Sequence, residues 1–215
     1  MSGSPATVHV VDDDTSLLKA LSRLLRASGY EVRAYASAGD FLLCEPGDGP
    51  ACLVLDVRMP GPSGLELQLA VEKQEHPLPI VFLTGHGDIP MSVRAMRAGA
   101  VDFLTKPVKR EALLRAIRTA LARDAERRTG RERLRILRAR FDTLTSRERD
   151  VFAHVVAGRL NKQIAADMGC SIRTVKIHRA RVMQKMQAAS LADLVRVAEA
   201  LRPAAPPKDG PSSRG

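Results

Sequence analysis

The sequence Val8-His9-Val10-Val11-Asp12-Asp13 joins a short apolar run to a pair of carboxylates. Three later apolar runs end on one polar residue each, namely Asp56, Thr84 and Lys106. Runs this short and this apolar are typical of strands that are buried on both faces of a parallel sheet. Because the carboxyl ends of such strands meet at one edge, where open sheets bind ligands, we expect these groups to share one site.

The first half of the chain alternates strand-like and helix-like segments. In most of the segments between the predicted strands, apolar residues recur at the spacing of a helix. Strands are predicted at residues 7–11, 30–35, 51–56, 79–84 and 101–105. This alternation predicts an α/β fold, a doubly wound (βα)₅ sheet of the flavodoxin-like kind with helices on both faces.

Charge divides the chain into two halves. Residues 1–122 hold 13 Lys and Arg against 14 Asp and Glu, a net charge of −1, and residues 123–215 hold 21 against 10, a net charge of +11. A cationic second half suits a polyanionic partner, nucleic acid before a membrane surface. No stretch is apolar enough to span a bilayer or to act as a signal peptide, so we expect a cytoplasmic protein without a membrane partner.

The second half contains helix signals and no strand pattern. Thr145 and Glu148 have the spacing of a capping box, and Asn161, Ser171 and Ser190 are each placed to cap a further helix. These signals predict an all-α domain of four helices. A tight turn separates the second helix from the third, which is helix-turn-helix geometry, and the third helix would enter the DNA major groove.

The carboxylates at the predicted sheet edge suit a metal ion. Asp12, Asp13 and Asp56 would repel one another, so their expected role is to hold a hard divalent cation, and Mg²⁺ fits best because it takes few carboxylates plus water and phosphate oxygens. Lys106 can pair with an anion beside the metal, and the Thr84 hydroxyl can donate a hydrogen bond to it. A nucleophile with charge stabilisation is what phosphoryl transfer to a carboxylate requires, and Asp56 is the candidate nucleophile.

Four ordered motifs make residues 5–125 resemble the receiver domain of two-component response regulators. The motifs are Val11-Asp12-Asp13, Leu55-Asp56-Val57-Arg58-Met59-Pro60 followed by Gly64, Leu83-Thr84-Gly85, and Lys106-Pro107. The resemblance implies that Asp56 accepts phosphate from a sensor histidine kinase. It implies a Mg²⁺ site formed by Asp13, Asp56 and the backbone carbonyl of Arg58, with Asp12 assisting. It also implies that Thr84 and Lys106 contact the phosphoryl group, and that Thr84 and Phe103 form the switch.

The helix predicted after Ser171 has a buried and an exposed face. Val175, Val182 and Met186, with Ile172, recur at helical spacing and mark the buried stripe. We expect DNA contacts from residues that project away from this stripe, from its flanks and from the start of the preceding helix. These residues are Lys162, Arg173, Thr174, Lys176, Ile177, Arg179, Ala180, Arg181 and Gln184, with Lys185 as a further phosphate contact.

Residues 140–202 resemble the LuxR-type DNA-binding domain. The resemblance rests on Leu144-Thr145-Ser146-Arg147-Glu148-Arg149, Asn161-Lys162-Gln163-Ile164-Ala165, Thr174-Val175-Lys176-Ile177-His178 and Lys185-Met186. A receiver followed by such a domain resembles the FixJ/NarL class of response regulators, and the sequence from Leu83 to Asp88 favours the FixJ-type branch. This class implies a transcription regulator and not an enzyme, a homodimer on activation, and RNA polymerase as a further partner.

The expected boundaries are a receiver at residues 5–123, a helical linker at 124–141, a LuxR-type helix-turn-helix domain at 142–202 and a tail at 203–215. Gly130 is a candidate interruption of the linker helix. The tail is expected to be disordered because its Pro, Gly and Ser residues cannot bury enough apolar surface.

Two alternatives remain beside this interpretation. Aspartate-nucleophile phosphatases also combine a (βα) sheet, Mg²⁺ and Asp, Thr and Lys residues, but they place the nucleophile after the first strand as Asp-x-Asp-x-Thr/Val. Here the sequence Asp12-Asp13-Asp14-Thr15-Ser16 has Ser in the last place, and no cap domain is evident. The second alternative is a DNA-binding transcription factor whose receiver is structural and is not phosphorylated. Phosphoryl labelling at Asp56 separates it from a working switch.

Overall fold

The computed structural model describes residues 5–44, 47, 49–85 and 89–202. The chain separates into two compact units, and the division falls between Arg128 and Thr129. This division lies inside a single helix, α5 (Arg110–Asp142). The tail expected at residues 203–215 lies outside the described part of the chain.

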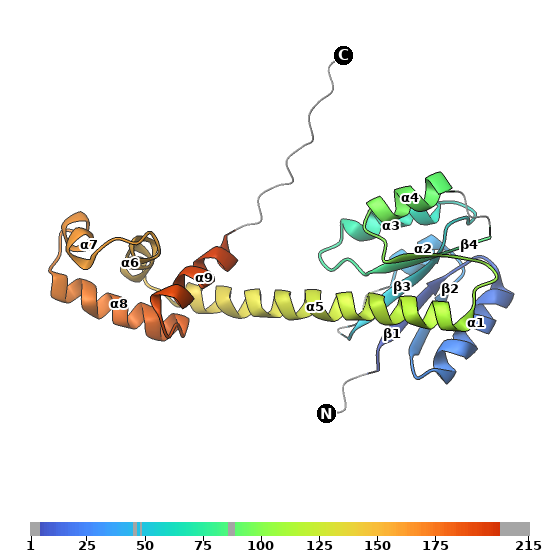
Figure 1. Ribbon diagram of the computed structural model, residues 1–215, viewed down its shortest axis with the longest axis horizontal. Coiled ribbons are helices and arrows are strands. Elements are labelled where there is room, and N and C mark those ends of the chain that lie inside the picture. The colour runs from blue at the N-terminus through green and yellow to red at the C-terminus, as the bar shows by residue number, and fades with distance from the viewer. Residues whose placement is uncertain (1–4, 45–46, 48, 86–88, 203–215) are drawn as a thin grey trace, which may run out of the picture. The chain divides into compact units, whose positions relative to one another are not determined.

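The first unit is built on a five-stranded parallel sheet with the strand order β2-β1-β3-β4-β5 (Figure 1). The strands are β1 (Thr7–Val11), β2 (Glu31–Tyr35), β3 (Ala51–Asp56), β4 (Ile80–Thr84) and β5 (Asp102–Thr105). Val11 pairs with Leu55, so Asp12 and Asp56 come next on two adjacent strands. The strand order reverses at β1, which makes this edge the switch point where open sheets bind ligands. The predicted α/β class is confirmed.

Helices cover both faces of the sheet (Figure 1). Helix α1 (Thr15–Ala27) and α5 pack against one face, and α2 (Ala38–Leu42), α3 (Gly64–Glu72) and α4 (Ile89–Arg97) pack against the other. Because side chains alternate along a strand, Val8 and Val10 join the core under α1 and α5, whereas Val11 joins the core under α2 and α3. The sequence pattern gave no range for α2, since five residues are too few to show helical periodicity.

Helix α5 is continuous through Gly130. The expectation that this glycine interrupts the helix is therefore wrong. One glycine costs a helix interior only about 1 kcal/mol relative to alanine, and 33 helical residues outweigh that cost. All residues of the expected linker, 124–141, lie within α5.

The second unit contains α6 (Ser146–Val156), α7 (Asn161–Asp167), α8 (Ile172–Met186) and α9 (Leu191–Leu201), after the last turns of α5. Its core gathers apolar side chains from all four helices, including Val151, Ile164, Val182 and Leu194. This arrangement confirms the predicted all-α domain with a helix-turn-helix.

The helix caps agree with the sequence signals at three of four places. Thr145 and Glu148 form the predicted capping box, and Ser171 and Ser190 each accept a hydrogen bond from the first turn of their helix. The cap predicted at Asn161 is wrong. Leu160 is the N-cap of α7, and its N–H donates to Gln163 Oε1 at 2.9 Å.

Candidate functional site

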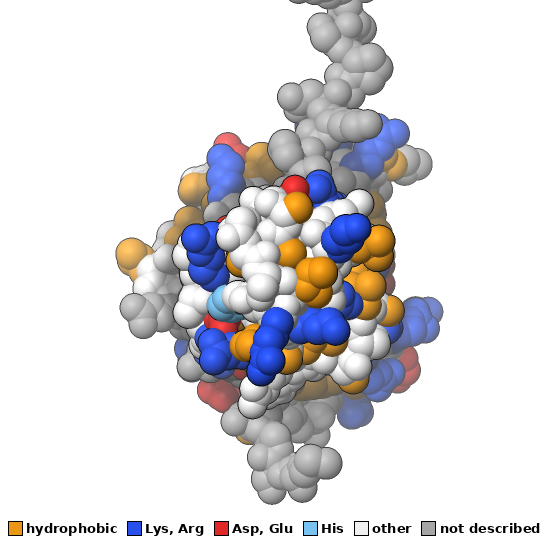
Figure 2. Space-filling view, turned by 90° about the vertical axis from the view of Figure 1, so that its left-hand side faces the viewer, with side chains coloured by type: hydrophobic (Ala, Val, Ile, Leu, Met, Phe, Trp, Pro, Cys, Tyr) orange, Lys and Arg blue, Asp and Glu red, His pale blue; other side chains and the backbone are white. Residues whose placement is uncertain are grey.

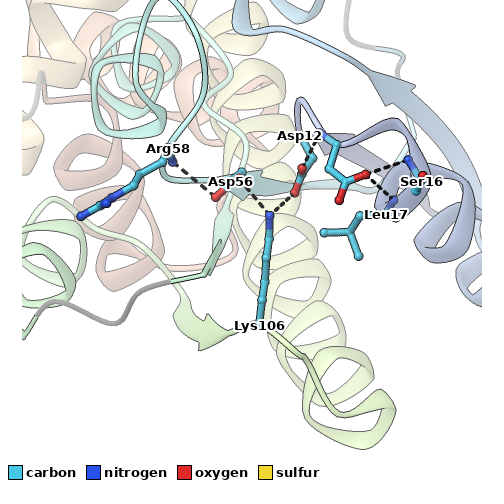
Figure 3. Close-up of polar contacts among 7 residues, drawn as sticks. Asp12, Ser16, Leu17, Asp56, Arg58 and Lys106 are labelled. Atoms are coloured by element: carbon cyan, nitrogen blue, oxygen red, sulfur yellow. Dashed lines mark hydrogen bonds and ion pairs between the residues drawn. The ribbon is translucent and has the colours of Figure 1, made fainter.

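Three carboxylates, those of Asp12, Asp13 and Asp56, gather at the carboxyl edge of the sheet. Figure 3 shows two of them, Asp12 and Asp56, on either side of Lys106. Asp12 is 1% exposed and Asp56 is 6% exposed, whereas Asp13 is exposed to solvent. One carboxylate oxygen from each residue lies within 4.8 Å of the others. The structure thus brings together the three aspartates that the sequence pattern places at one edge.

Lys106 follows β5 and lies between two of these carboxylates. Its Nζ donates to Asp12 Oδ2 at 2.6 Å and to Asp56 Oδ2 at 2.9 Å. Burial is the largest effect on Asp12 and raises the pKa of its carboxyl, while the hydrogen bond from Lys106 acts in the opposite direction. Burial alone would lower the pKa of Lys106, but the hydrogen bonds to Asp12 and Asp56 outweigh it and the pKa is raised. Lys106 is therefore held as a cation that neutralises part of the acidic cluster.

The donor set of this edge fits a divalent cation. Three carboxylates and one ammonium leave two negative charges, and carboxylate oxygens are the ligands that hard cations such as Mg²⁺ prefer. Lys106 occupies only one oxygen of Asp12 and one of Asp56. Because each of the three aspartates offers a carboxylate oxygen close to the other two, the residues present are chemically suited to hold such an ion.

The turn after β1 is fixed by hydrogen bonds. Asp14 is the N-cap of α1, and its Oδ1 accepts from the N–H groups of Ser16 and Leu17 at 2.8 and 3.1 Å (Figure 3). The Asp14 N–H in turn donates to Asp12 Oδ1 at 3.0 Å. Asp14 thus positions the turn that carries Asp12 and Asp13.

The loop after β3 lies close to Asp56. The Arg58 N–H donates to Asp56 Oδ1 at 3.3 Å, and the Gly64 N–H donates to the Val57 carbonyl at 3.0 Å. A methyl group on Gly64 would collide with the Asp56 carbonyl oxygen and would lie 3.0 Å from Val57 Cα. The start of α3 can therefore approach the Asp56 loop this closely only with glycine at position 64.

Thr84 and Phe103 lie on the two adjacent strands β4 and β5. Thr84 is fully buried, and its carbonyl accepts from the Lys106 N–H at 2.7 Å. Phe103 pairs in register with Phe82, and the two ring centroids are 6.1 Å apart. Since Thr84 is two residues beyond Phe82, Thr84 and Phe103 project from the same face of the sheet. The backbone between β4 and Lys106 thus links these residues to the acidic cluster.

The second unit presents a cationic surface at the start of α7 and α8. This surface also contains exposed apolar groups. Figure 2 shows Lys and Arg side chains around apolar atoms on this side. Of the residues expected to contact DNA, Thr174, Arg179 and Lys185 are half-buried. The exposed ones are Lys162, Arg173, Lys176, Ile177, Ala180, Arg181 and Gln184.

The buried stripe of α8 is confirmed at Val175, Val182 and Met186 but is wrong at Ile172. Ile172 is 43% exposed; it is the first residue of α8, and the buried stripe begins three positions later at Val175. Asn161, which was predicted to be a helix cap, has a different contact in the structure. Its Oδ1 accepts from Arg179 Nη1 at 3.1 Å and so ties the two helices of the motif together.

Lys185 has partners inside the domain. Its Nζ donates to Glu148 Oε2 at 2.6 Å and to the Thr143 carbonyl at 2.9 Å. Hydrogen bonds from Lys185 and from the Thr145 N–H lower the pKa of Glu148 from 4.5 to about 2. The ammonium that was expected to meet a DNA phosphate is thus already engaged by a buried carboxylate.

A parallel-sheet domain with this acidic edge, followed by a helix-turn-helix domain, defines the class of DNA-binding response regulators. Residues 8–118 match the family described as the response regulator receiver domain, and residues 142–198 match the bacterial regulatory proteins of the luxR family. The chain belongs to the response regulators that carry a LuxR-type DNA-binding domain and regulate transcription.

Relatives match both domains in one alignment. Nodulation protein W of Bradyrhizobium diazoefficiens is 48% identical over 200 residues, covering 93% of this chain and 88% of that protein. The transcriptional regulatory protein FixJ of Rhizobium meliloti is 44% identical over 192 residues, covering 89% and 94%. The solved structure of the response regulator StyR is 48% identical with a TM-score of 0.80, covering 91% of this chain and 99% of that one. The resemblance to the FixJ/NarL class is confirmed.

The family indicates a kinase and DNA as partners of this chain. Within the described residues, no helix combines the length and apolar character needed to cross a membrane.

Proposed function

We propose that this response regulator is switched by transfer of a phosphoryl group from a histidine kinase to Asp56, and that the switch controls its affinity for DNA. The observation that carries the proposal is the position of Lys106 Nζ between Asp12 and Asp56, with Asp13 beside them. A carboxylate oxygen of Asp56 would form the new P–O bond as the bond to the donor breaks. Lys106 would keep Asp12 as a partner and contact the added phosphoryl group, which the Thr84 hydroxyl would also approach.

Mg²⁺ is the proposed cofactor of this step. Asp12, Asp13, Asp56 and the backbone carbonyl of Arg58 would hold it, and it would neutralise charge on the phosphoryl oxygens. The role of this chain is to orient Asp56 through the Arg58 N–H and to supply the Lys106 ammonium. Both groups act without a change of protonation.

Activation is proposed to pass from Thr84 and Phe103 to the surface formed by α4, β5 and α5, where two copies would form a homodimer. Exposed apolar side chains on α4, Val93 at 42% and Met96 at 45%, support this surface. A two-fold dimer presents two recognition helices to two DNA half-sites. Coupling between sites is typically about 1 to 3 kcal/mol, and binding to two half-sites adds avidity to that difference.

RNA polymerase is the further partner and the cytoplasm the compartment that such a regulator implies.

Labelling with a small phosphodonor tests the phosphorylation site. With acetyl phosphate and Mg²⁺, the intact wild-type mass should rise by one phosphoryl group. Asp56→Asn should abolish this rise, and Asp40→Asn, at an exposed position on α2, should retain it. In sedimentation experiments, beryllium fluoride should convert to a dimer only the proteins that keep Asp56, and without it these proteins should remain monomers. A wild type that takes up no phosphoryl group would favour the alternative, a transcription factor with a structural receiver.

The DNA contacts are tested by two lysines with different expected roles. Lys176→Ala on α8 should weaken binding to specific DNA more than to random DNA. Lys162→Ala at the start of α7 should weaken both, because a phosphate contact carries no sequence information, and should reduce the salt slope by about one unit per lost contact. Equal losses on both DNAs from Lys176→Ala would contradict the assignment of α8 as the recognition helix. In this proposal the receiver ends at residue 123, the linker at residue 141 and the DNA-binding domain at residue 202.

A further inference from the structure

The last turn of α5 is fixed to the helical domain by several contacts. The Phe141 ring packs edge-on against Phe152 with centroids 5.3 Å apart, and the Arg149 guanidinium lies 5.3 Å from the Phe141 centroid. Arg149 Nη2 also donates to the Asp142 carbonyl at 3.3 Å. These contacts join the end of the linker helix to α6.

One ammonium extends this junction to the recognition helix. Lys185 lies in the last turn of α8, and its Nζ reaches the Thr143 carbonyl just after α5 and the Glu148 carboxylate in α6. Glu148 Oε2 also accepts from the Thr145 N–H at 2.9 Å. The Glu148 side chain is 3% exposed and the Lys185 side chain is 34% exposed. A charge-assisted hydrogen bond to a buried carboxylate has a well-defined geometry, so the end of α8 is held at a set position.

The opposite end of the same helix carries the side chains expected to read DNA. Fifteen helical residues span about 22 Å, and helices of this length are stiff. A tilt of about 10° at the Lys185 end would shift the first turn of α8 by roughly 4 Å, by the rise per residue of a helix. The contacts that place this end therefore decide how the first turn meets the groove.

We propose that Lys185 is a positioning residue that sets the angle of α8 against the end of the linker, through Glu148 and Thr143. It does not contact a DNA phosphate. This inference rests on the proposed function, in which activation changes the surface formed by α4, β5 and α5, and α5 is the helix that continues to Asp142 beside Thr143. It makes Lys185 part of the path by which activation changes DNA affinity.

The test uses the full chain and a DNA duplex selected from a random pool with wild-type protein in beryllium fluoride and Mg²⁺. Lys185→Met alone leaves the Glu148 charge buried without its partner and can unfold the domain. The main variant is therefore Glu148→Gln combined with Lys185→Met. The control is Arg181→Met, which removes an exposed cation from the same helix. Fluorescence anisotropy gives the affinity with and without beryllium fluoride, and its dependence on salt concentration.

The two variants should behave in opposite ways. The double variant should keep the wild-type salt slope. It should lose most of the increase in affinity on activation, so that the ratio of the affinities with and without beryllium fluoride falls at least threefold. Arg181→Met should lower the salt slope by about 0.9 for each subunit bound, and should keep the ratio of the affinities measured with and without beryllium fluoride. A double variant whose salt slope falls by about 0.9 for each subunit bound would identify Lys185 as a phosphate contact. An unchanged ratio would leave it a purely stabilising residue, and either result overturns the inference. A wild type without any response to beryllium fluoride would instead overturn the proposed switch.

Discussion

The buried ring of His9 predicts that the stability of the first unit depends on pH. His9 lies in β1, is 1% exposed, and packs between Tyr35, stacked at 5.8 Å, and the edge of Phe41 at 5.6 Å. The Tyr35 hydroxyl donates to Cys44 Sγ at 3.0 Å, so it accepts from His9 Nδ1 at 3.1 Å. His9 Nε2 then carries the lone pair, and within the described residues it has no hydrogen-bond partner. Protonation would place a charged N–H there without an acceptor.

The magnitude follows from the two protonation states. Burial, and secondly the charge of Arg33, lower the pKa of His9 from 6.5 to about 4. Between pH 6.5 and pH 4 the unfolded chain binds a proton at His9 that the folded chain does not bind. The free energy of unfolding therefore decreases as the pH falls through this range. The slope for one proton is about 1.4 kcal/mol per pH unit, which amounts to about 3 kcal/mol between pH 6.5 and pH 4.

Replacement of His9 by Phe isolates this contribution, because it removes the titrating group and keeps an aromatic ring. The chain has two tyrosines and no tryptophan, and Tyr30 and Tyr35 both lie in the first unit. Tyrosine fluorescence in urea therefore reports the unfolding of that unit alone. Between pH 7 and pH 5 wild type should lose about 2 kcal/mol more stability than His9→Phe. His76→Gln, at an exposed position, should follow wild type. Identical pH dependence in wild type and His9→Phe would refute the reasoning.

Three further substitutions have defined outcomes. Gly64→Ala should destabilise the first unit by about 1 to 3 kcal/mol in the same tyrosine assay, because the added methyl meets the Asp56 carbonyl. Gly130→Ala should raise the helix content of α5 and its stability by about 0.5 to 1 kcal/mol, measured by circular dichroism, since a methyl there meets no atom within 4 Å. The low pKa of Glu148, about 2, means that its stabilisation is present above pH 4.5 and is lost as the pH falls toward 2. The stability gap between wild type and Glu148→Gln in urea should therefore narrow over that range.

The sequence was sufficient for the sheet and for the acidic edge. Two rules suffice to predict that Asp12, Asp56, Thr84 and Lys106 lie together. Each of these residues follows a short apolar run that is typical of a strand, and the strands of a parallel sheet end at one common edge. The capping residues Thr145, Ser171 and Ser190 were also readable, because a cap is a local hydrogen bond between residues three positions apart.

The contacts of long side chains could not be predicted in the same way. Helical periodicity places Lys185 on a flank of α8, but its partner Glu148 lies 37 residues earlier in the chain. The same limit applies to Asn161, which looks like a cap by residue type and instead holds Arg179 from another helix. Ile172 was assigned to the core by its apolar character, although it is the first residue of α8 and is 43% exposed. In each case tertiary packing decided the partner.

The charges at the acidic edge bear on how the two states of the proposed switch differ. In the resting protein, Lys106 offsets part of the repulsion between Asp12 and Asp56, because its ammonium contacts both. Phosphorylation of Asp56 would replace one negative charge by about two, so a single ammonium would offset a smaller share of the total. The phosphorylated edge therefore needs a cation and the Thr84 hydroxyl more than the resting edge does. Since linkage is reciprocal, any cation that stabilises the phosphorylated state must itself bind more tightly to that state.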